Sequence, residues 1–125
     1  MAEQGGGSFI ATASIAGLRG NKAIGLYGLT KAALVQLVKN LAVEWGPGNV
    51  RANAIAPGLT ATSWTANILS DEERTVRRLS LTPLRRIATT QEIAGTAVFL
   101  AGPAAGSITG QTIVIDGGVT ISDGN

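Results

Sequence analysis

The stretch Tyr27-Gly28-Leu29-Thr30-Lys31 (YGLTK) opens the longest helical pattern in this sequence. Residues four apart on an α-helix lie one above the other, so the Tyr27 phenol and the Lys31 ammonium are predicted to share one space. A fixed cation beside a phenol favours the phenolate, which makes the phenol usable as a proton donor and acceptor. On its own the spacing is weak evidence, because an ordinary helix-surface pair can have it too.

Around this pair, apolar residues recur at spacings of three and four and predict a helix over residues 26–45. The residues of this stripe are Leu34, Leu37, Val38, Leu41 and Trp45. The run Gly46-Pro47-Gly48 ends the helix. Alanines on the other faces widen the apolar surface, so we expect burial on more than one side, between a sheet and a partner subunit.

Ser14 follows an apolar run that predicts a strand over residues 8–13. Such a strand would deliver Ser14 to the carboxyl edge of a sheet, where open α/β proteins place their sites. A serine hydroxyl there can donate to, or accept from, a carbonyl or alcohol oxygen. The glycine-rich residues 5–8 come before this strand, whereas a phosphate-binding loop would follow one, so we interpret them as an entry turn.

Two more strands are predicted, one over residues 50–56 with the nearly continuous apolar character of buried parallel strands, and one over residues 112–115. Two capping-box patterns start helices, Ser70-Asp71-Glu72-Glu73 and Thr89-Thr90-Gln91-Glu92, and the second helix runs to Gly102. The order β-α-β-α-β has connections long enough for right-handed crossovers. We therefore predict an α/β fold, half of a doubly wound parallel sheet, in one domain.

Composition excludes several classes of site. The chain has no cysteine and no histidine, which excludes disulfides, thiolate metal sites, Ser-His-Asp triads and Cys-His dyads; we predict no metal. Its net charge of +2 compels no nucleic-acid partner. No apolar run reaches the ~18–20 residues that span a bilayer, and no signal-peptide pattern is present. We therefore expect a cytoplasmic protein with no membrane contact.

Ser14, Tyr27 and Lys31, taken together in this order, resemble the active-site signature of the short-chain dehydrogenase/reductase family. Residues 49–58 are similar to the family's strand leading to its nicotinamide-side loop, and residues 109–118 to its final strand motif. Nearly the whole chain thus resembles the carboxyl-terminal half of the family's Rossmann-like fold. It looks most like the bacterial group with 3-oxoacyl-carrier-protein reductases and sugar or alcohol dehydrogenases, which does not fix a substrate.

The resemblance implies an oxidoreductase that moves a hydride between NAD or NADP and a small carbonyl or alcohol. In that role Ser14 would hold the substrate oxygen and Tyr27 would donate or accept the proton. Lys31 would support the phenolate and bind the nicotinamide ribose. The implied cofactor-binding residues are Tyr27, Lys31, Pro57, Gly58, Thr60 and Thr62.

The chain departs from the family pattern at its start. Family members begin with a βαβ unit whose glycine-rich turn binds the pyrophosphate and whose acidic or basic residue chooses NAD or NADP. That unit and the family's asparagine from the preceding helix are absent, and residues 1–4 resemble the end of that helix. We therefore expect residues 1–125 to be a truncated Rossmann-like domain that starts at an internal methionine or is a fragment, and to bind cofactor poorly alone. The unpaired edge of the first strand, or the long helix, should then make it a homo-oligomer.

Two other functions stay open at this stage. One is a catalytically inactive fragment or assembly module in which the same residues serve only structure. The other is nucleic-acid binding, against which the neighbouring acidic residues and the lack of stacking aromatics argue; a solvated helix face or subunit contact explains the basic cluster more simply. In the family this region is a mobile segment that covers the substrate. The cluster comprises Arg74, Arg77, Arg78, Arg85 and Arg86.

Overall fold

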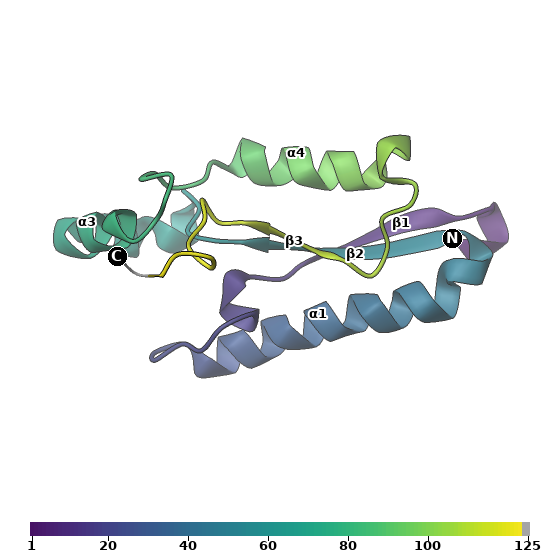
Figure 1. The fold of residues 1–125 in the computed structure, drawn as a ribbon, viewed down its shortest axis with the longest axis horizontal. Helices are drawn as coiled ribbons and strands as arrows, with labels where there is room; N and C mark the ends of the chain where they lie inside the picture. The colour runs from purple at the N-terminus through teal and green to yellow at the C-terminus, as the bar shows by residue number, and fades with distance from the viewer. Residues whose placement is uncertain (124–125) are drawn as a thin grey trace.

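The computed structural model describes residues 1–123, which contain one parallel sheet. Its strands are β1 (Gly7–Thr12), β2 (Val50–Pro57) and β3 (Thr112–Ile115), in the spatial order β1-β2-β3. Because all strands run in the same direction, their carboxyl ends meet at one end of the molecule (Figure 1). The predicted α/β fold with parallel strands is confirmed, and each strand boundary lies within one residue of its prediction.

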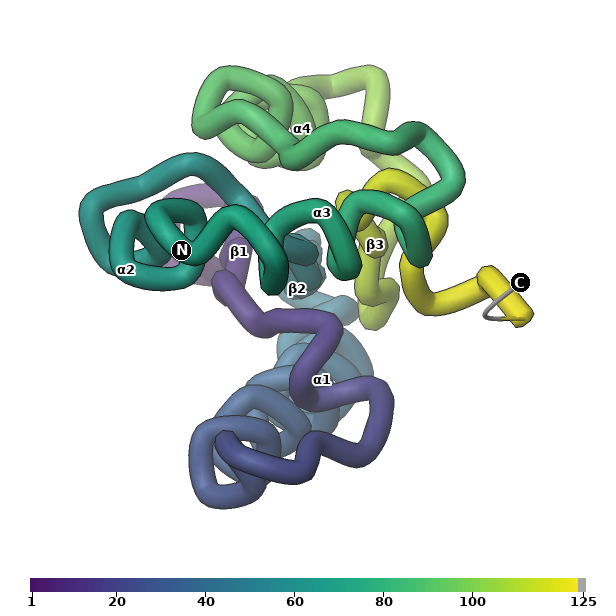
Figure 2. Tube along the Cα trace, turned by 90° about the vertical axis from the view of Figure 1, so that its left-hand side faces the viewer, coloured from purple at the N-terminus to yellow at the C-terminus, as the bar shows by residue number. Residues whose placement is uncertain are grey.

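Helices cover both faces of the sheet. The long helix α1 (Gly25–Trp45) lies on one face and α4 (Thr90–Ala101) on the other (Figure 1). The short helices α2 (Ala66–Leu69) and α3 (Glu72–Ser80) lie at the carboxyl end of the strands, where α3 crosses in front of the sheet (Figure 2). Within residues 1–123, no helix combines the length and the apolar character needed to cross a bilayer.

The core between α1 and the sheet is built from small side chains. Alternate residues of β2 face α1, namely Ala52, Ala54 and Ala56, and all are fully buried. Their small size lets the helix approach the sheet closely, so that Val38 of α1 is also fully buried. Partly buried residues complete this core: Phe9, Leu34, Val35, Leu41 and Ala42.

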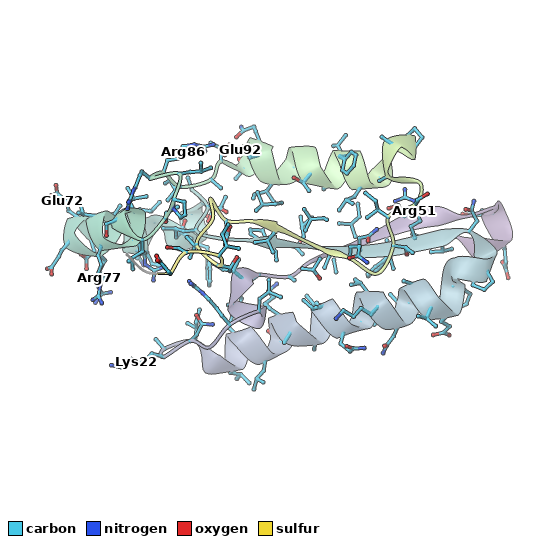
Figure 3. All side chains as sticks on the ribbon, in the orientation of Figure 1. Lys22, Arg51, Glu72, Arg77, Arg86 and Glu92 are labelled. Carbon is cyan, nitrogen blue, oxygen red and sulfur yellow. The ribbon has the colours of Figure 1, made fainter. Side chains whose placement is uncertain are left out.

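The opposite core lies under α4 and joins it to the same strand. Ile55 of β2 is buried with Leu100 and Ala105. At the end of α4, the Arg51 guanidinium donates to the carbonyl oxygens of Leu100 at 2.7 Å and Gly102 at 3.3 Å (Figure 3). A cation at this position satisfies carbonyl groups that have no partner within the helix and complements the helix dipole. Arg51 therefore fixes the carboxyl end of α4 to the sheet.

A buried amide holds the chain segment that leads into β3. Asn53 is fully buried in β2. Its Nδ2 donates to the carbonyl oxygen of Ile108 at 2.8 Å, and its Oδ1 accepts from the Gln111 amide at 3.0 Å. Buried polar groups are tolerated only when they are paired in this way. This side chain thus helps to hold the segment before β3 against β2, together with the backbone bonds from Gly110 to Ala52 and from Ala54 to Gln111.

The apolar stripe of α1 agrees with the prediction at three residues and differs from it at two. Leu37 and Trp45 were expected in the core, but they are 40% and 46% exposed. The prediction is confirmed for Leu34, Val38 and Leu41. The helix turns by about 100° per residue, and Val35 and Ala42 complete the face that packs on the sheet. On its outward side, Leu26, Leu29 and Val43 are 78%, 69% and 83% exposed. The helix therefore has apolar side chains on more than one face, as predicted. Within residues 1–123, no other element buries the outward face.

The two capping-box predictions have different outcomes. The first is wrong by one residue, because Asp71, not Ser70, is the N-cap of α3 and accepts from the Arg74 amide at 3.0 Å. A carboxylate is at least as good an N-cap as a hydroxyl. The second is confirmed: Thr89 and Glu92 form the reciprocal pair that starts α4.

Candidate active site

An open cleft of about 1190 Å³ lies at the carboxyl edge of the sheet. Its walls are the ends of β1 and β2, the start of α1, the segment after β2, one side of α3 and the first half of α4. Every site residue predicted from the sequence lines this cleft: Ser14, Tyr27, Lys31, Pro57, Gly58, Thr60 and Thr62. Residues far apart in the chain are therefore brought to one cavity.

Ser14 is fixed by a short turn that directly follows β1. It is the N-cap of the 3-10 turn Ile15–Gly17, and its Oγ accepts from the Ala16 amide at 3.1 Å. A hydroxyl that accepts one hydrogen bond still has its own proton to donate. Ser14 can therefore donate to a ligand oxygen without losing the contact that orients it.

Two glycines allow this turn to press against α1. A Cβ at Gly17 would lie 2.6 Å from the Ala32 nitrogen, and one at Gly28 would lie 2.8 Å from the Ala16 carbonyl oxygen. Real Cβ atoms do not approach that closely, so only glycine permits this packing. Neither glycine has a role that the sequence predicts. Together they set how closely the turn that begins at Ser14 packs on the helix that carries Lys31.

Lys31 joins the start of α1 to the end of β1. Its Nζ donates to the Thr12 carbonyl oxygen at 2.9 Å and lies 5.5 Å from the centroid of the Tyr27 ring. The predicted proximity of phenol and ammonium is therefore present. An ammonium carries three donors, so two remain for other partners.

The Tyr27 ring also contacts Trp64. The two ring centroids are 5.6 Å apart, with an interplanar angle of 34°. Trp64 belongs to the 3-10 turn Ser63–Thr65 and is 70% exposed in the cleft. Sequence reasoning missed this residue; the available signal was an aromatic side chain in the polar stretch that follows β2.

The loop after β2 is shaped by a close approach to the turn after β3. The Gly58 amide donates to the Ile115 carbonyl oxygen at 2.9 Å. A Cβ on Gly58 would lie 2.8 Å from the Asp116 Cα, so a side chain here would separate the two strand ends. The glycine predicted as part of a cofactor loop is thus required for the shape of that loop.

The predicted threonines differ in how free their hydroxyls are. Thr60 is buried, and its Oγ1 donates to the Gly58 carbonyl oxygen at 3.2 Å. Thr62 is exposed and its Oγ1 lies 3.2 Å from the Thr65 Oγ1. Thr65 is buried and donates to the Thr60 carbonyl oxygen at 2.6 Å. Thr62 therefore presents a hydroxyl to the cleft, whereas Thr60 and Thr65 mainly hold the loop together.

Asp116 organises the turn that follows β3. Its carboxylate accepts from the amides of Gly118 at 2.8 Å and Thr120 at 2.7 Å. Burial acts to raise the pKa of Asp116, but the hydrogen bonds from Thr120 and Gly118, with Arg19 nearby, outweigh it and lower the pKa below its ordinary value. A negative charge is thus kept beside the cleft without lining it.

A family model described as Enoyl-(Acyl carrier protein) reductase matches residues 1–120. The chain belongs to the short-chain dehydrogenase/reductase family. It is 48% identical over 118 residues to a tropinone reductase homolog of Arabidopsis thaliana, covering 94% of this chain and 38% of that protein. It is 43% identical over 125 residues to the 7alpha-hydroxysteroid dehydrogenase of Bacteroides fragilis, covering 97% of this chain and 46% of that protein.

Solved structures of this family have the same fold. A short-chain type dehydrogenase/reductase from Mycobacterium ulcerans superposes with a TM-score of 0.95 at 38% identity, over 98% of this chain and 44% of that one. A putative 2-deoxy-D-gluconate 3-dehydrogenase from Agrobacterium tumefaciens, solved with bound NADP, gives a TM-score of 0.92 at 32% identity, over 96% of this chain and 49% of that one. The chain thus spans less than half the length of these family members.

Proposed function

We propose that this protein is an NAD(P)-dependent oxidoreductase that transfers a hydride between nicotinamide and a small carbonyl or alcohol, using Ser14, Tyr27 and Lys31. The observation that carries the proposal is the position of the Lys31 ammonium, 5.5 Å from the Tyr27 ring centroid, in a cleft that Ser14 also lines. Membership in the short-chain dehydrogenase/reductase family supports the same reaction class.

Each of these side chains has a distinct task in the proposed mechanism. The Ser14 hydroxyl donates to the substrate oxygen and holds the carbonyl in place. The Tyr27 phenol gives its proton to that oxygen during reduction and takes it back during oxidation. Lys31 keeps positive charge beside the phenol, which stabilises the deprotonated form during the transfer. The cofactor, when bound, supplies or accepts the hydride.

The chemistry of the cleft fits the nicotinamide half of such a cofactor. Lys31 has two donors left for ribose hydroxyls after its bond to Thr12. The loop that starts at Pro57-Gly58 and the exposed Thr62 hydroxyl would hold the nicotinamide side, with Thr60 shaping the loop. Two solved relatives are described with bound NADP and with NADH, which supports NAD or NADP as the cofactor.

The substrate class is a small molecule. The relatives are named for tropinone, a hydroxysteroid and gluconate, which share a carbonyl or alcohol but little else. We therefore propose a small carbonyl or alcohol compound as the substrate and no nucleic-acid partner. We place the reaction in the cytoplasm as part of the same proposal.

We also propose that the protein is a homo-oligomer. Leu26, Leu29 and Val43 form an exposed apolar face on α1, here called the outer α1 face. Burying such a face against a second copy would remove apolar area from water. Within residues 1–123, β1 pairs only with β2, so its other edge is a second surface to which another strand could add.

An inactive assembly module is the second candidate. It is favoured by the exposed apolar residues on the outer side of α1, a surface that a partner could bury. In this candidate the residues of the cleft serve only structure, and the affinity of residues 1–125 for the cofactor is too low for turnover.

One experiment separates the two candidates. Purified protein is assayed with NADH and NADPH against a panel of ketones, and with NAD and NADP against the corresponding alcohols. Activity that falls by about a hundredfold or more in Tyr27→Phe supports the oxidoreductase. Full activity in Tyr27→Phe removes that residue from the mechanism. Absence of cofactor binding in calorimetry supports the module.

A further inference from the structure

The charges around the cleft are distributed very unevenly. The basic residues that line it are Arg19, Lys22, Lys31, Arg74, Arg77 and Arg78. None of the acidic residues of the described chain lines it, although the whole sequence has eight. Lys22 and Arg77 extend from different segments at the same end of the molecule (Figure 3). A cleft lined by one sign of charge attracts ligands of the opposite sign.

One face of α3 supplies half of this charge. Arg74, Arg77, Arg78 and Leu81 line the cleft at the spacing i, i+3, i+4 and i+7, the pattern of a single helical face. Arg74 is paired with Asp71, Nε to Oδ2, at 2.9 Å. Within residues 1–123, the guanidinium groups of Arg77 and Arg78 have no hydrogen bond or ion pair. The helix dipole favours cations in the last turn of a helix, which accounts for Arg77 and Arg78 at the end of α3. It does not account for their position on the face that lines the cleft.

A smaller side pocket of about 190 Å³ adjoins the cleft. Five residues line both cavities and so form the boundary between them: Ile15, Arg19, Leu59, Arg78 and Leu81. Ile15 directly follows Ser14, the residue proposed to hold the substrate oxygen. The boundary between the two cavities therefore lies next to the proposed reacting end of the substrate, and its two arginines come from different segments of the chain.

The charged residues that line the side pocket carry one more positive charge than negative charge, once ion pairs are counted. Arg86 is bound to Glu92 through a hydrogen-bonded ion pair, with Nη1 to Oε2 at 3.0 Å, so these two charges cancel. The Asp116 carboxylate is held by two backbone amides and balances one further positive charge. Of Arg19 and Arg78, one positive charge is left without a counterion among the described residues that line the pocket.

We propose that the substrate carries a carboxylate or phosphate group, received between Arg19 and Arg78 where the side pocket opens from the cleft. This inference rests on the proposed function, because it takes the reacting carbonyl or alcohol to be at Ser14 and Tyr27. An arginine fork matches a planar carboxylate or a phosphate by paired hydrogen bonds. The anionic end of the substrate would then determine which way round it enters.

The test compares one carbonyl compound with and without its charge. Dissociation constants of 4-oxopentanoate and of its methyl ester are measured by ligand-observed NMR for the wild type and for Arg19→Gln with Arg78→Gln. The control, Lys39→Gln with Arg85→Gln, removes the same charge from exposed residues outside the cleft. Circular dichroism melts of all variants check folding.

The wild type should bind the carboxylate about five- to tenfold more tightly than the ester, and added KCl should weaken this preference. The preference should vanish in Arg19→Gln with Arg78→Gln and persist in the control. Equal binding of the two compounds by the wild type, or a preference that survives the double substitution, overturns the proposal.

A third ligand, nicotinamide mononucleotide, separates a substrate anion from the cofactor's own phosphate. If the Arg19 and Arg78 substitutions weaken the mononucleotide as much as they weaken 4-oxopentanoate, the arginines serve the cofactor and the proposal is wrong. The binding assay needs no turnover. A retained carboxylate preference in a protein with no hydride transfer would therefore leave this subsite standing while the proposed function fails.

Discussion

The Lys31 ammonium donates a hydrogen bond of 2.9 Å to the carbonyl oxygen of Thr12, the last residue of β1. The same ammonium lies 5.5 Å from the Tyr27 ring centroid. The strand end therefore holds the cation in place beside the phenol. This arrangement makes the ammonium a fixed part of the site, and not a mobile surface charge.

Removal of this cation should impair catalysis more than stability. Lys31→Met is expected to lower kcat by about a hundredfold or more, because the proposed mechanism needs this cation for acid–base catalysis by the phenol. Lys39→Met on the exposed part of the same helix is the matched control and should keep wild-type kcat. Thermal melts establish that both variants are folded. Wild-type kcat in Lys31→Met would show that the ammonium plays no part in the reaction.

A methyl group at residue 17 should disturb both stability and the position of Ser14. A Cβ there would lie 2.6 Å from the Ala32 nitrogen, so the turn and α1 must separate in Gly17→Ala. We expect a loss of about 1–3 kcal/mol in the free energy of unfolding, measured with urea. Gly20→Ala is the control, since a Cβ there has no atom within 4 Å. Equal stability of both variants would contradict the close packing of this turn.

The amide of Asn53 should be indispensable to the position of β3. Asn53→Ala leaves the Ile108 carbonyl and the Gln111 amide without their partner. We expect a loss of about 2–4 kcal/mol in the free energy of unfolding, because each buried group left unpaired is costly. Asn40→Ala, at an exposed position of α1, should change it little. An equally small effect at both positions would mean that water replaces the lost bonds.

Acid should weaken the start of α4. The hydrogen bond from the Arg86 side chain, together with that from the Thr89 amide, lowers the pKa of Glu92 to about 2 from an ordinary value of 4.5. A carboxyl whose pKa is lower in the folded chain adds stability above pH 4.5, and this contribution is lost as the pH falls from 4.5 to about 2. The difference in melting temperature between the wild type and Glu92→Gln should therefore shrink across that range. A difference independent of pH would show that the ionised carboxylate is not responsible.

Charge on the outer α1 face should dissociate the proposed oligomer. Leu29→Glu with Val43→Glu places two carboxylates where an apolar contact is proposed, and both side chains are largely exposed in the chain, so folding should be unaffected. Light scattering coupled to size exclusion should report a lower mass for this variant than for the wild type. Val76→Glu, at a residue of α3 that is 60% exposed, is the control. A monomeric wild type at micromolar concentration would rule out the assembly.

Much of the fold follows from local sequence patterns. Alternation and spacing placed the strands and the two long helices to within a residue or two, since such patterns depend on neighbours along the chain. Contacts between residues far apart in the sequence could not be predicted in this way. No pattern reveals that Arg51 binds the end of α4 or that Asn53 holds residues 108–111, because these partners are determined only when the layers pack.

The candidate site shows the same division. The sequence predicted that Tyr27 and Lys31 lie together, because both belong to one helix. It did not predict Trp64 beside Tyr27, since that contact depends on the path of the loop after β2. Nor did it separate Thr60 from Thr62, whose burial differs although they are two residues apart. The Ser70 prediction failed because a serine and an aspartate in succession can both cap a helix.

The bond between Lys31 and Thr12 also bears on the order in which the chain folds. It closes a segment of only 19 residues, which contains Ser14 and Tyr27, whereas the Asn53 amide reaches partners 55 and 58 residues away. Closing a short loop costs less chain entropy than closing a long one. This corner can therefore form while β3 is still unattached. Pulsed hydrogen exchange during refolding should then show amides near Tyr27 protected before those of β3.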